Sequence, residues 1–233
     1  MKARRKRRRA LPREVAPLWA GPLGMHTSWM AARDYSRRTI QNAERAVADF
    51  AEWCEGLGVD APSGVTLSLL ERYAAHLVEV RTRAGTRLSA GVQHRRLSSL
   101  RVFFRFLARH HLILSSPATE LELPALGHRL PRTVLTHEEA ERVLAQPSLS
   151  TRLGIRDRSI LETLYSTGVR RSELVRLSLF DIDVVRGTVM VREGKGKKDR
   201  VVPIGERALD WFERYVADVR PSLGLTAGEQ SLY

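Results

Sequence analysis

The chain has 233 residues, enough for one large domain or two small ones, and its 39 basic against 26 acidic side chains give a net charge of +13. Such an excess favours a polyanionic partner, with nucleic acid ahead of an anionic membrane surface. The single cysteine, Cys54, excludes an internal disulfide and any zinc cluster. No apolar run predicts a transmembrane helix or a signal peptide, so we expect a reduced, cytoplasmic setting.

The N-terminal segment, residues 1–25, is predicted to be a basic disordered tail. Residues 2–9 (KARRKRRR) hold seven basic side chains and cannot form a core. Prolines and glycines interrupt the sequence that follows them. A nucleic-acid-binding arm and sequence upstream of a true start at Met25 are the two interpretations of this tail, and we weigh them equally.

Residues 26–112 have the apolar spacing of a helical domain. Ser36, Thr66 and Ser89 are each placed to cap the start of a helix. The last of these helices has a buried stripe with the spacing i, i+3, i+7 and i+10, formed by Leu97, Leu100, Phe104 and Leu107.

Arginines recur at every fourth position on another face of that last helix, at Arg101, Arg105 and Arg109. A solvated face is the ordinary interpretation of isolated charges. These three repel one another at i, i+4 and have no acidic residue among them, and a phosphate backbone would relieve the repulsion. We therefore assign them, with Arg95 on the same helix, as candidate DNA-binding residues.

Residues 113–135 are rich in proline and glycine and predict an interdomain linker before a second domain at 136–233. Thr136 and Glu139 form a capping box that opens this domain. The predicted elements after its first helix are helices at 156–166, 172–177 and 206–219 and a β-hairpin of strands 188–192 and 200–204.

Two segments of the second domain have the residue types of a phosphate site. Arg170 follows a glycine at a break between helices, where the guanidinium and free helix N–H groups would both attract an anion, and Glu173 lies one turn on. Lys195 lies between two glycines at the hairpin tip, where an ammonium can donate a proton that arginine retains. The non-functional alternatives are a surface ion pair for Arg170 and Glu173 and a solvent-exposed basic turn for the lysine segment, including Lys197 and Lys198.

Together these segments resemble the tyrosine recombinase family, especially its Xer-like and phage-integrase-like members. The motif T-G-hydrophobic-R-x-S-E-L is present at 167–174, and G-K-G-x-K-x-R at 194–200 is followed by V-P-I-G at 202–205. In the N-terminal half, residues 97–107 (LSSLRVFFRFL) resemble the family's core-binding signature. The resemblance covers about residues 28–233.

The resemblance implies a mainly α fold with a small β-sheet: an all-α, SAM-like core-binding domain followed by part of an α+β catalytic domain. Arg170 would bind oxygens of the scissile phosphate, Lys195 would protonate the 5′-hydroxyl leaving group, and Glu173 would support them from behind. No metal or other cofactor is implied. The implied partner is double-stranded DNA, with a possible homo-oligomer on it and no membrane.

The family pattern is incomplete in this sequence. The family's His-x-x-Arg motif, later His or Trp and nucleophilic tyrosine all follow the hairpin, whereas the last histidine here is His137 and only Tyr215 and Tyr233 follow. We assign neither tyrosine as nucleophile and expect a C-terminally truncated chain that lacks strand cleavage. We also expect the apolar face of the 206–219 helix to be partly exposed.

Three hypotheses follow for the function. The chain is a recombinase-family enzyme represented by its N-terminal two-thirds, or a non-catalytic DNA-binding regulator or pseudogene remnant, or a basic RNA-associated protein. Aromatic residues make up only 6% of the chain and no RNA-recognition signature is present, which disfavours the third.

Overall fold

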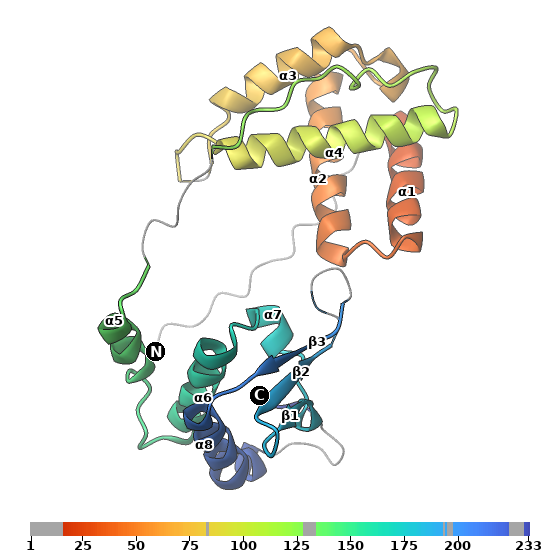
Figure 1. Ribbon diagram of the computed structural model, residues 1–233. Helices are drawn as coiled ribbons and strands as arrows, with labels where there is room; N and C mark the ends of the chain where they lie inside the picture. The colour runs from red at the N-terminus through yellow and green to blue at the C-terminus, as the bar shows by residue number, and fades with distance from the viewer. Residues whose placement is uncertain (1–15, 83, 128–133, 193, 195–197, 224–230) are drawn as a thin grey trace. The chain divides into compact units, whose positions relative to one another are not determined.

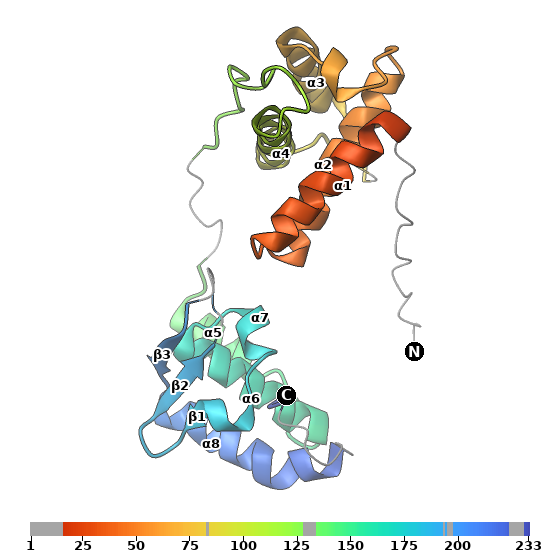
Figure 2. The same ribbon diagram turned by 90° about the vertical axis from the view of Figure 1, so that its right-hand side faces the viewer.

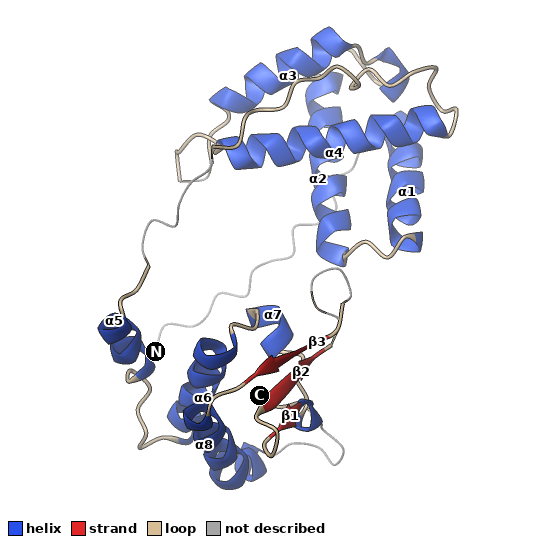
Figure 3. Ribbon diagram, in the orientation of Figure 1, coloured by secondary structure: helices blue, strands red, loops and turns tan. Residues whose placement is uncertain are grey.

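The computed structural model describes residues 16–82, 84–127, 134–192, 194, 198–223 and 231–233 (Figure 1). The chain divides between residues 129 and 130 into two compact units, each with its own hydrophobic core. Helices predominate and the strands form one small antiparallel sheet, as the sequence predicted (Figure 3). None of the helices in the described ranges is long and apolar enough to cross a membrane.

In the described residues of unit 1 the regular secondary structure is helical, apart from one isolated bridge between Arg81 and Arg87. Helices α1 and α2 run side by side, and α4 crosses them (Figures 1 and 2). Fully buried aromatic side chains, Phe50 of α2 and Phe104 of α4 among them, fill the space between these helices. The helices of unit 1 are α1 (Pro17–Ala32), α2 (Arg37–Glu55), the short η1 (Pro62–Gly64), α3 (Leu67–Glu79) and α4 (Ala90–Arg109).

The helix starts predicted in unit 1 are confirmed. The Ser36 hydroxyl accepts a hydrogen bond from the Thr39 N–H at 3.2 Å, and the Thr66 hydroxyl accepts one from the Leu69 N–H at 3.3 Å. Ser89 occupies the N-cap position of α4 but makes no side-chain capping bond. Local sequence therefore fixes where these helices begin.

The predicted tail ends earlier than residue 25, because residues 17–25 form the first half of α1. Trp19 is fully buried and Leu23 is 6% exposed, both in the core of unit 1. Pro17 occupies the first helical position, where a missing N–H costs nothing. Pro22 removes one hydrogen bond inside the helix, and burial of the flanking apolar side chains offsets that loss. Residues N-terminal to Met25 therefore contribute to the core.

The start of the predicted linker also belongs to unit 1. Ala118 is fully buried and Leu121 is 3% exposed, both within the core cluster of unit 1. The His94 ring is hydrogen-bonded to the Pro124 carbonyl oxygen through Nδ1 at 2.9 Å. The segment from 113 to about 124 is therefore packed on α4, in spite of its proline-rich sequence.

Unit 2 places a three-stranded antiparallel sheet beside α6 and α8 (Figure 1). β1 pairs with β2, and β2 pairs with β3 with Val191 opposite Arg200. The Thr136–Glu139 capping box is present in full. The elements are α5 (His137–Leu144), α6 (Arg152–Thr167), α7 (Arg171–Leu174), η2 (Leu179–Asp181), β1 (Ile182–Asp183), β2 (Thr188–Val191), β3 (Arg200–Pro203), α8 (Glu206–Arg214), η3 (Tyr215–Val219) and η4 (Arg220–Leu223).

The expectation that the last helix exposes part of an apolar face is correct only in part. Leu209 and Val216 are partly buried, whereas Phe212 is 6% exposed and Tyr215 is 1% exposed, because α8 and η3 pack against α6. The C-terminal residues 231–233 add to this core: Leu232 is fully buried, and its N–H donates to the Leu177 carbonyl at 2.9 Å. Residues of the chain itself therefore cover part of the apolar face that we expected to be exposed.

Candidate nucleic-acid interface

Arg170 is placed by the turn that joins α6 to α7. Gly168 ends α6 in the left-handed conformation, with φ of 62°, and Val169 then turns into the core at 4% exposure. Arg170 becomes the N-cap residue of α7, a single helical turn. Its backbone N–H donates to Glu173 Oε2 at 2.9 Å and is therefore not free to bind an anion. Anion binding at this position would depend on the Arg170 side chain.

Glu173 holds the guanidinium groups of two arginines. Arg170 Nη1 donates to Glu173 Oε1 at 2.9 Å, and Arg200 Nη1 and Nη2 donate to the two carboxylate oxygens at 3.1 and 2.7 Å. Hydrogen bonds from Arg200 and then Arg170 outweigh burial and lower the pKa of Glu173 to about 2. The carboxylate side chain is 1% exposed whereas the Arg170 side chain is 55% exposed. Arg170 is thus anchored at one nitrogen and open to solvent elsewhere.

Gly194 packs against this cluster at the base of the predicted hairpin loop. A Cβ atom there would lie 2.7 Å from Arg200 Nη1 and 2.9 Å from the Lys198 carbonyl oxygen. The Gly194 N–H donates to that same carbonyl at 3.1 Å and closes the loop. The absence of a side chain at Gly194 therefore leaves room for the Arg200 guanidinium.

Of the three lysines of the loop, the structure describes only Lys198. Lys195, the candidate proton donor, and Lys197 lie outside the described residues. Lys198 is exposed next to the loop closure. The structure therefore brings Arg170 and Glu173 together and places Lys198 near Gly194, and it leaves Lys195 as a sequence-based candidate.

The arginine face of α4 is the second cluster, and it consists of Arg95, Arg101, Arg105 and Arg109. At 3.6 residues per turn these positions fall within about one third of the helix circumference. All four side chains are exposed, and none makes an ion pair with any residue in the described part of the chain. Arg96 provides the contrast: it lies on another face of α4 and pairs with Asp49 of α2 at 3.0 Å.

A pocket of about 440 Å³ lies beside the arginine face. Two of the four arginines, Arg101 and Arg105, contribute to its wall together with hydroxyl side chains from α4 and from the segment after it. Guanidinium and hydroxyl groups are the donors that proteins direct at phosphate oxygens. The lining residues are Ser98, Arg101, Val102, Arg105, Ser116, Ala118, Thr119 and Leu123.

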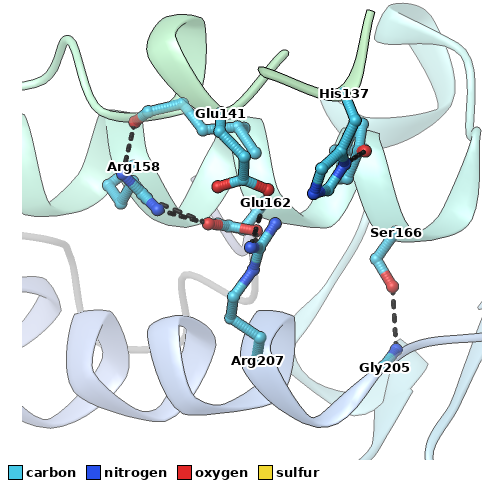
Figure 4. A network of polar contacts seen from close by, with 9 residues as sticks. His137, Glu141, Arg158, Glu162, Ser166, Gly205 and Arg207 are labelled. Atoms are coloured by element: carbon cyan, nitrogen blue, oxygen red, sulfur yellow. Dashed lines mark hydrogen bonds and ion pairs between the residues drawn. The ribbon is translucent and has the colours of Figure 1, made fainter. Parts of the chain in front are cut away.

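A third polar network, centred on Glu162 of α6, was not predicted from the sequence (Figure 4). Arg158 donates to Glu162 Oε1 from Nε and Nη2 at 3.0 and 2.7 Å, and Arg207 Nε donates to Glu162 Oε2 at 3.0 Å. Arg207 Nη1 also reaches Glu141 of α5 at 2.8 Å. Because Glu162 is 1% exposed and the network joins α5, α6 and α8, we assign it to holding unit 2 together.

Of the two tyrosines that follow the hairpin, Tyr215 is buried and Tyr233 is partly buried. Tyr215 is 1% exposed and its hydroxyl donates to the Leu232 carbonyl oxygen at 2.9 Å. The Tyr233 hydroxyl is hydrogen-bonded to Ser159 and Thr163 of α6 at 2.8 and 3.1 Å, and burial raises the pKa of Tyr233. Neither phenol is presented to a ligand in this arrangement.

Comparison with known proteins shows what the chain is similar to. Residues 133–230 match the model of the phage integrase family. The chain is 43% identical over 208 residues to Tyrosine recombinase XerC 2 of Ralstonia nicotianae, an alignment that covers 89% of this chain and 60% of the relative. The chain is therefore similar to tyrosine recombinases over most of its length. The resemblance predicted from the two motifs is thereby confirmed.

Other relatives agree with this assignment. Tyrosine recombinase XerD of Pseudomonas aeruginosa is 45% identical over 127 residues, covering 54% of this chain and 42% of the relative. The chain therefore spans about 60% or less of the length of these recombinases.

Solved structures show the same fold. The XerH site-specific recombinase bound to a palindromic difH substrate, in a post-cleavage complex, aligns with a TM-score of 0.66 at 16% identity, over 91% of this chain and 60% of that one. The Tn1549 transposon integrase in complex with circular intermediate DNA aligns with a TM-score of 0.64 at 19% identity, over 91% and 70%. At these identities the likeness establishes the architecture.

Proposed function

We propose that this chain binds double-stranded DNA as the core-binding domain and part of the catalytic domain of a site-specific tyrosine recombinase. The observation that carries the proposal is the arginine face of α4: four exposed guanidinium groups on one helix face, with no acidic partner among the described residues and a pocket of hydroxyl groups beside them. Binding of such a cluster to DNA is favourable because each phosphate that an arginine neutralises releases a counterion from the DNA.

In this function Arg170 binds non-bridging oxygens of the scissile phosphate. Its guanidinium is anchored on Glu173 by Nη1 and is otherwise exposed, so its orientation is set before DNA arrives. Lys195 is the proposed proton donor to the 5′-hydroxyl leaving group, on the strength of the motif. Lys197 and Lys198 are proposed to contact the DNA backbone next to it.

The setting proposed for this activity is the cytoplasm, with a homo-oligomer assembled on DNA. Cys54, the single cysteine, is a buried free thiol, which fits a reducing compartment. The XerH relative is bound to a palindromic substrate, and two-fold symmetry of a DNA site is matched by two-fold symmetry of the protein on it.

The first experiment is a gel-shift of the purified chain on random-sequence duplex DNA at 50 and 200 mM salt, with a suicide substrate that traps covalent adducts run in parallel. We expect binding that weakens steeply with salt. Binding without an adduct supports a non-cleaving DNA binder, and an adduct means that a tyrosine of the chain acts as nucleophile. A folded chain that binds no duplex, or that binds RNA more tightly, contradicts the proposal.

A matched pair of variants tests the arginine face itself. Arg105→Gln removes one charge from the face, and Arg72→Gln removes one from an exposed position on α3. We expect Arg105→Gln to weaken binding and to lower the salt slope by about 1, and Arg72→Gln to leave both near wild type. Equal effects of the two substitutions would show that only net charge matters and that α4 is not the contact surface.

A further inference from the structure

Arg192, which follows β2, makes an ion pair unlike an ordinary surface contact. Its Nε donates to Asp181 Oδ1 at 2.8 Å, while the Arg192 side chain remains 66% exposed and that of Asp181 is 5% exposed. In the described part of the chain no other group bonds to the two Nη atoms of Arg192. The guanidinium is thus bonded at Nε, and most of the side chain is exposed, with the charge of Asp199 also acting on it.

Asp181 is fixed independently of Arg192. The backbone N–H and the hydroxyl of Ser178 both donate to Asp181 Oδ2 at 2.8 Å. Burial opposes ionisation of Asp181, but hydrogen bonds from Arg192 and Ser178 outweigh burial and lower the pKa below its usual value. The carboxylate is therefore a charged, immobile anchor, and Arg192 has lost side-chain entropy before any ligand binds.

The register of the sheet assigns Arg192 and Arg200 to opposite faces. Val191 lies opposite Arg200 and is 1% exposed, so both side chains point toward the core, where Arg200 meets Glu173. The next residue along β2 points to the other face because side chains alternate along a strand. Arg192 accordingly finds its anchor in Asp181 rather than in Glu173.

Both anchored guanidinium groups lie at the same end of the sheet, next to the loop that Gly194 and Lys198 close. The sequence of that loop concentrates three of the five lysines of the chain within 195–198. Lysine side chains favour a phosphate backbone as partner, and Arg192 is close to them in the sequence.

We propose that Arg192 is a preorganised phosphate-binding residue, so that the hairpin carries an anchored arginine on each face. Arg200 is held through Glu173 on one face, and Arg192 is held through Asp181 on the other. This inference rests on the proposed DNA-binding function and adds a residue that neither recombinase motif includes.

The chain provides a matched control at the other end of the same sheet. Arg186 lies in the β1–β2 turn, is 83% exposed, and pairs with Asp183 at 3.6 Å. Arg192→Gln and Arg186→Gln each remove one positive charge from an Arg–Asp pair. By fluorescence anisotropy on random duplex DNA, we expect Arg192→Gln to raise Kd about 3-fold to 10-fold and to lower the salt slope by about 1, whereas Arg186→Gln changes Kd less than about 2-fold.

Asp181→Asn separates anchoring from charge. The substitution keeps Arg192 and adds one positive charge to the protein, so an unanchored electrostatic contact predicts tighter binding. Anchoring predicts binding at least about 2-fold weaker with the salt slope unchanged. If thermal melting shows that Asp181→Asn does not fold, Arg192→Lys replaces it. Lysine keeps the charge without the fork, and we again expect weaker binding, whereas wild-type affinity would overturn the proposal.

The outcomes separate this inference from the proposed function. A folded wild-type chain that binds no duplex DNA refutes the function itself. A wild-type chain that binds DNA, with Arg192→Gln and Arg186→Gln equal in affinity and salt slope, leaves the function intact and removes Arg192 from the contact surface.

Discussion

His26 makes the stability of unit 1 depend on pH. Its ring is fully buried among Trp29, Phe103 and Phe106, with ring centroids 5.9, 5.4 and 5.1 Å away, and neither ring nitrogen has a hydrogen-bond partner in the described part of the chain. Burial lowers the pKa of His26 from 6.5 to about 4. The apolar site therefore accepts the neutral ring and rejects the protonated one.

The sign and size of the effect follow from linkage. Between pH 6.5 and about 4 the unfolded chain binds a proton at His26 that the folded chain does not, so stability is fully present above pH 6.5 and falls as the pH drops toward 4. The loss amounts to about 2 kcal/mol at pH 5 and approaches about 3 kcal/mol below pH 4. His26→Leu keeps the apolar volume and removes this dependence.

The assay is urea unfolding at pH 8 and pH 5, followed by tryptophan fluorescence. Three of the four tryptophans, Trp19, Trp29 and Trp53, belong to unit 1, and the two units are fitted as separate transitions because each has its own core. His76→Gln, an exposed position on α3, is the control and should keep the wild-type pH dependence. If wild type and His26→Leu lose equal stability between the two pH values, the reasoning is wrong.

Three further predictions concern unit 2, and thermal or chemical unfolding checks each of them. Gly168→Ala should cost about 1–2 kcal/mol because the residue has φ of 62°, and a loss below about 0.5 kcal/mol would contradict it. Glu162→Gln should cost about 3–5 kcal/mol because it leaves Arg158 and Arg207 without their buried carboxylate, and near-neutral behaviour would show that solvent replaces it. Leu232→Ala should cost about 2–4 kcal/mol in unit 2, whereas an unchanged midpoint would mean that the C-terminal residues do not pack there.

Signals that are local in sequence were sufficient to predict part of the structure. The hydroxyl caps at Ser36 and Thr66 and the capping box at Thr136 depend on residues three positions apart, and such pairs are visible in the sequence. Gly168 marked the end of α6 for the same reason. The fold class could be predicted because these caps precede amphipathic helices and because two valine-rich runs flank a glycine-containing loop.

Helix α1 was missed because proline and glycine were given too much weight. The spacing of Trp19, Leu23, His26 and Met30 is that of a buried helical face, and it was available in the sequence. Pro17 lies where a helix tolerates proline, so only Pro22 opposed the helix. The helical spacing of these buried residues is a stronger signal here than the prolines and glycines, and it predicts that the first domain includes this segment.

The partners in the candidate site could not be predicted, because they lie far apart in the sequence. Glu173 and Arg200 are 27 residues apart, and Glu162 and Arg207 are 45 apart. Sequence spacing identifies a charge but not the buried charge that it will meet after folding. Arg192 was for this reason indistinguishable from the many other arginines of the chain, and the partner of Arg200 could not be predicted.

Glu173 couples the two sequence motifs, because it is hydrogen-bonded to an arginine of each. Its carboxylate bonds both Arg170, in the first motif, and Arg200, in the second, so any change at Arg200 alters the hydrogen bonding that orients Arg170. The free-energy effects of substituting the two arginines should therefore be non-additive. A scan that substitutes one position at a time would therefore assign to each arginine an effect that belongs to the pair.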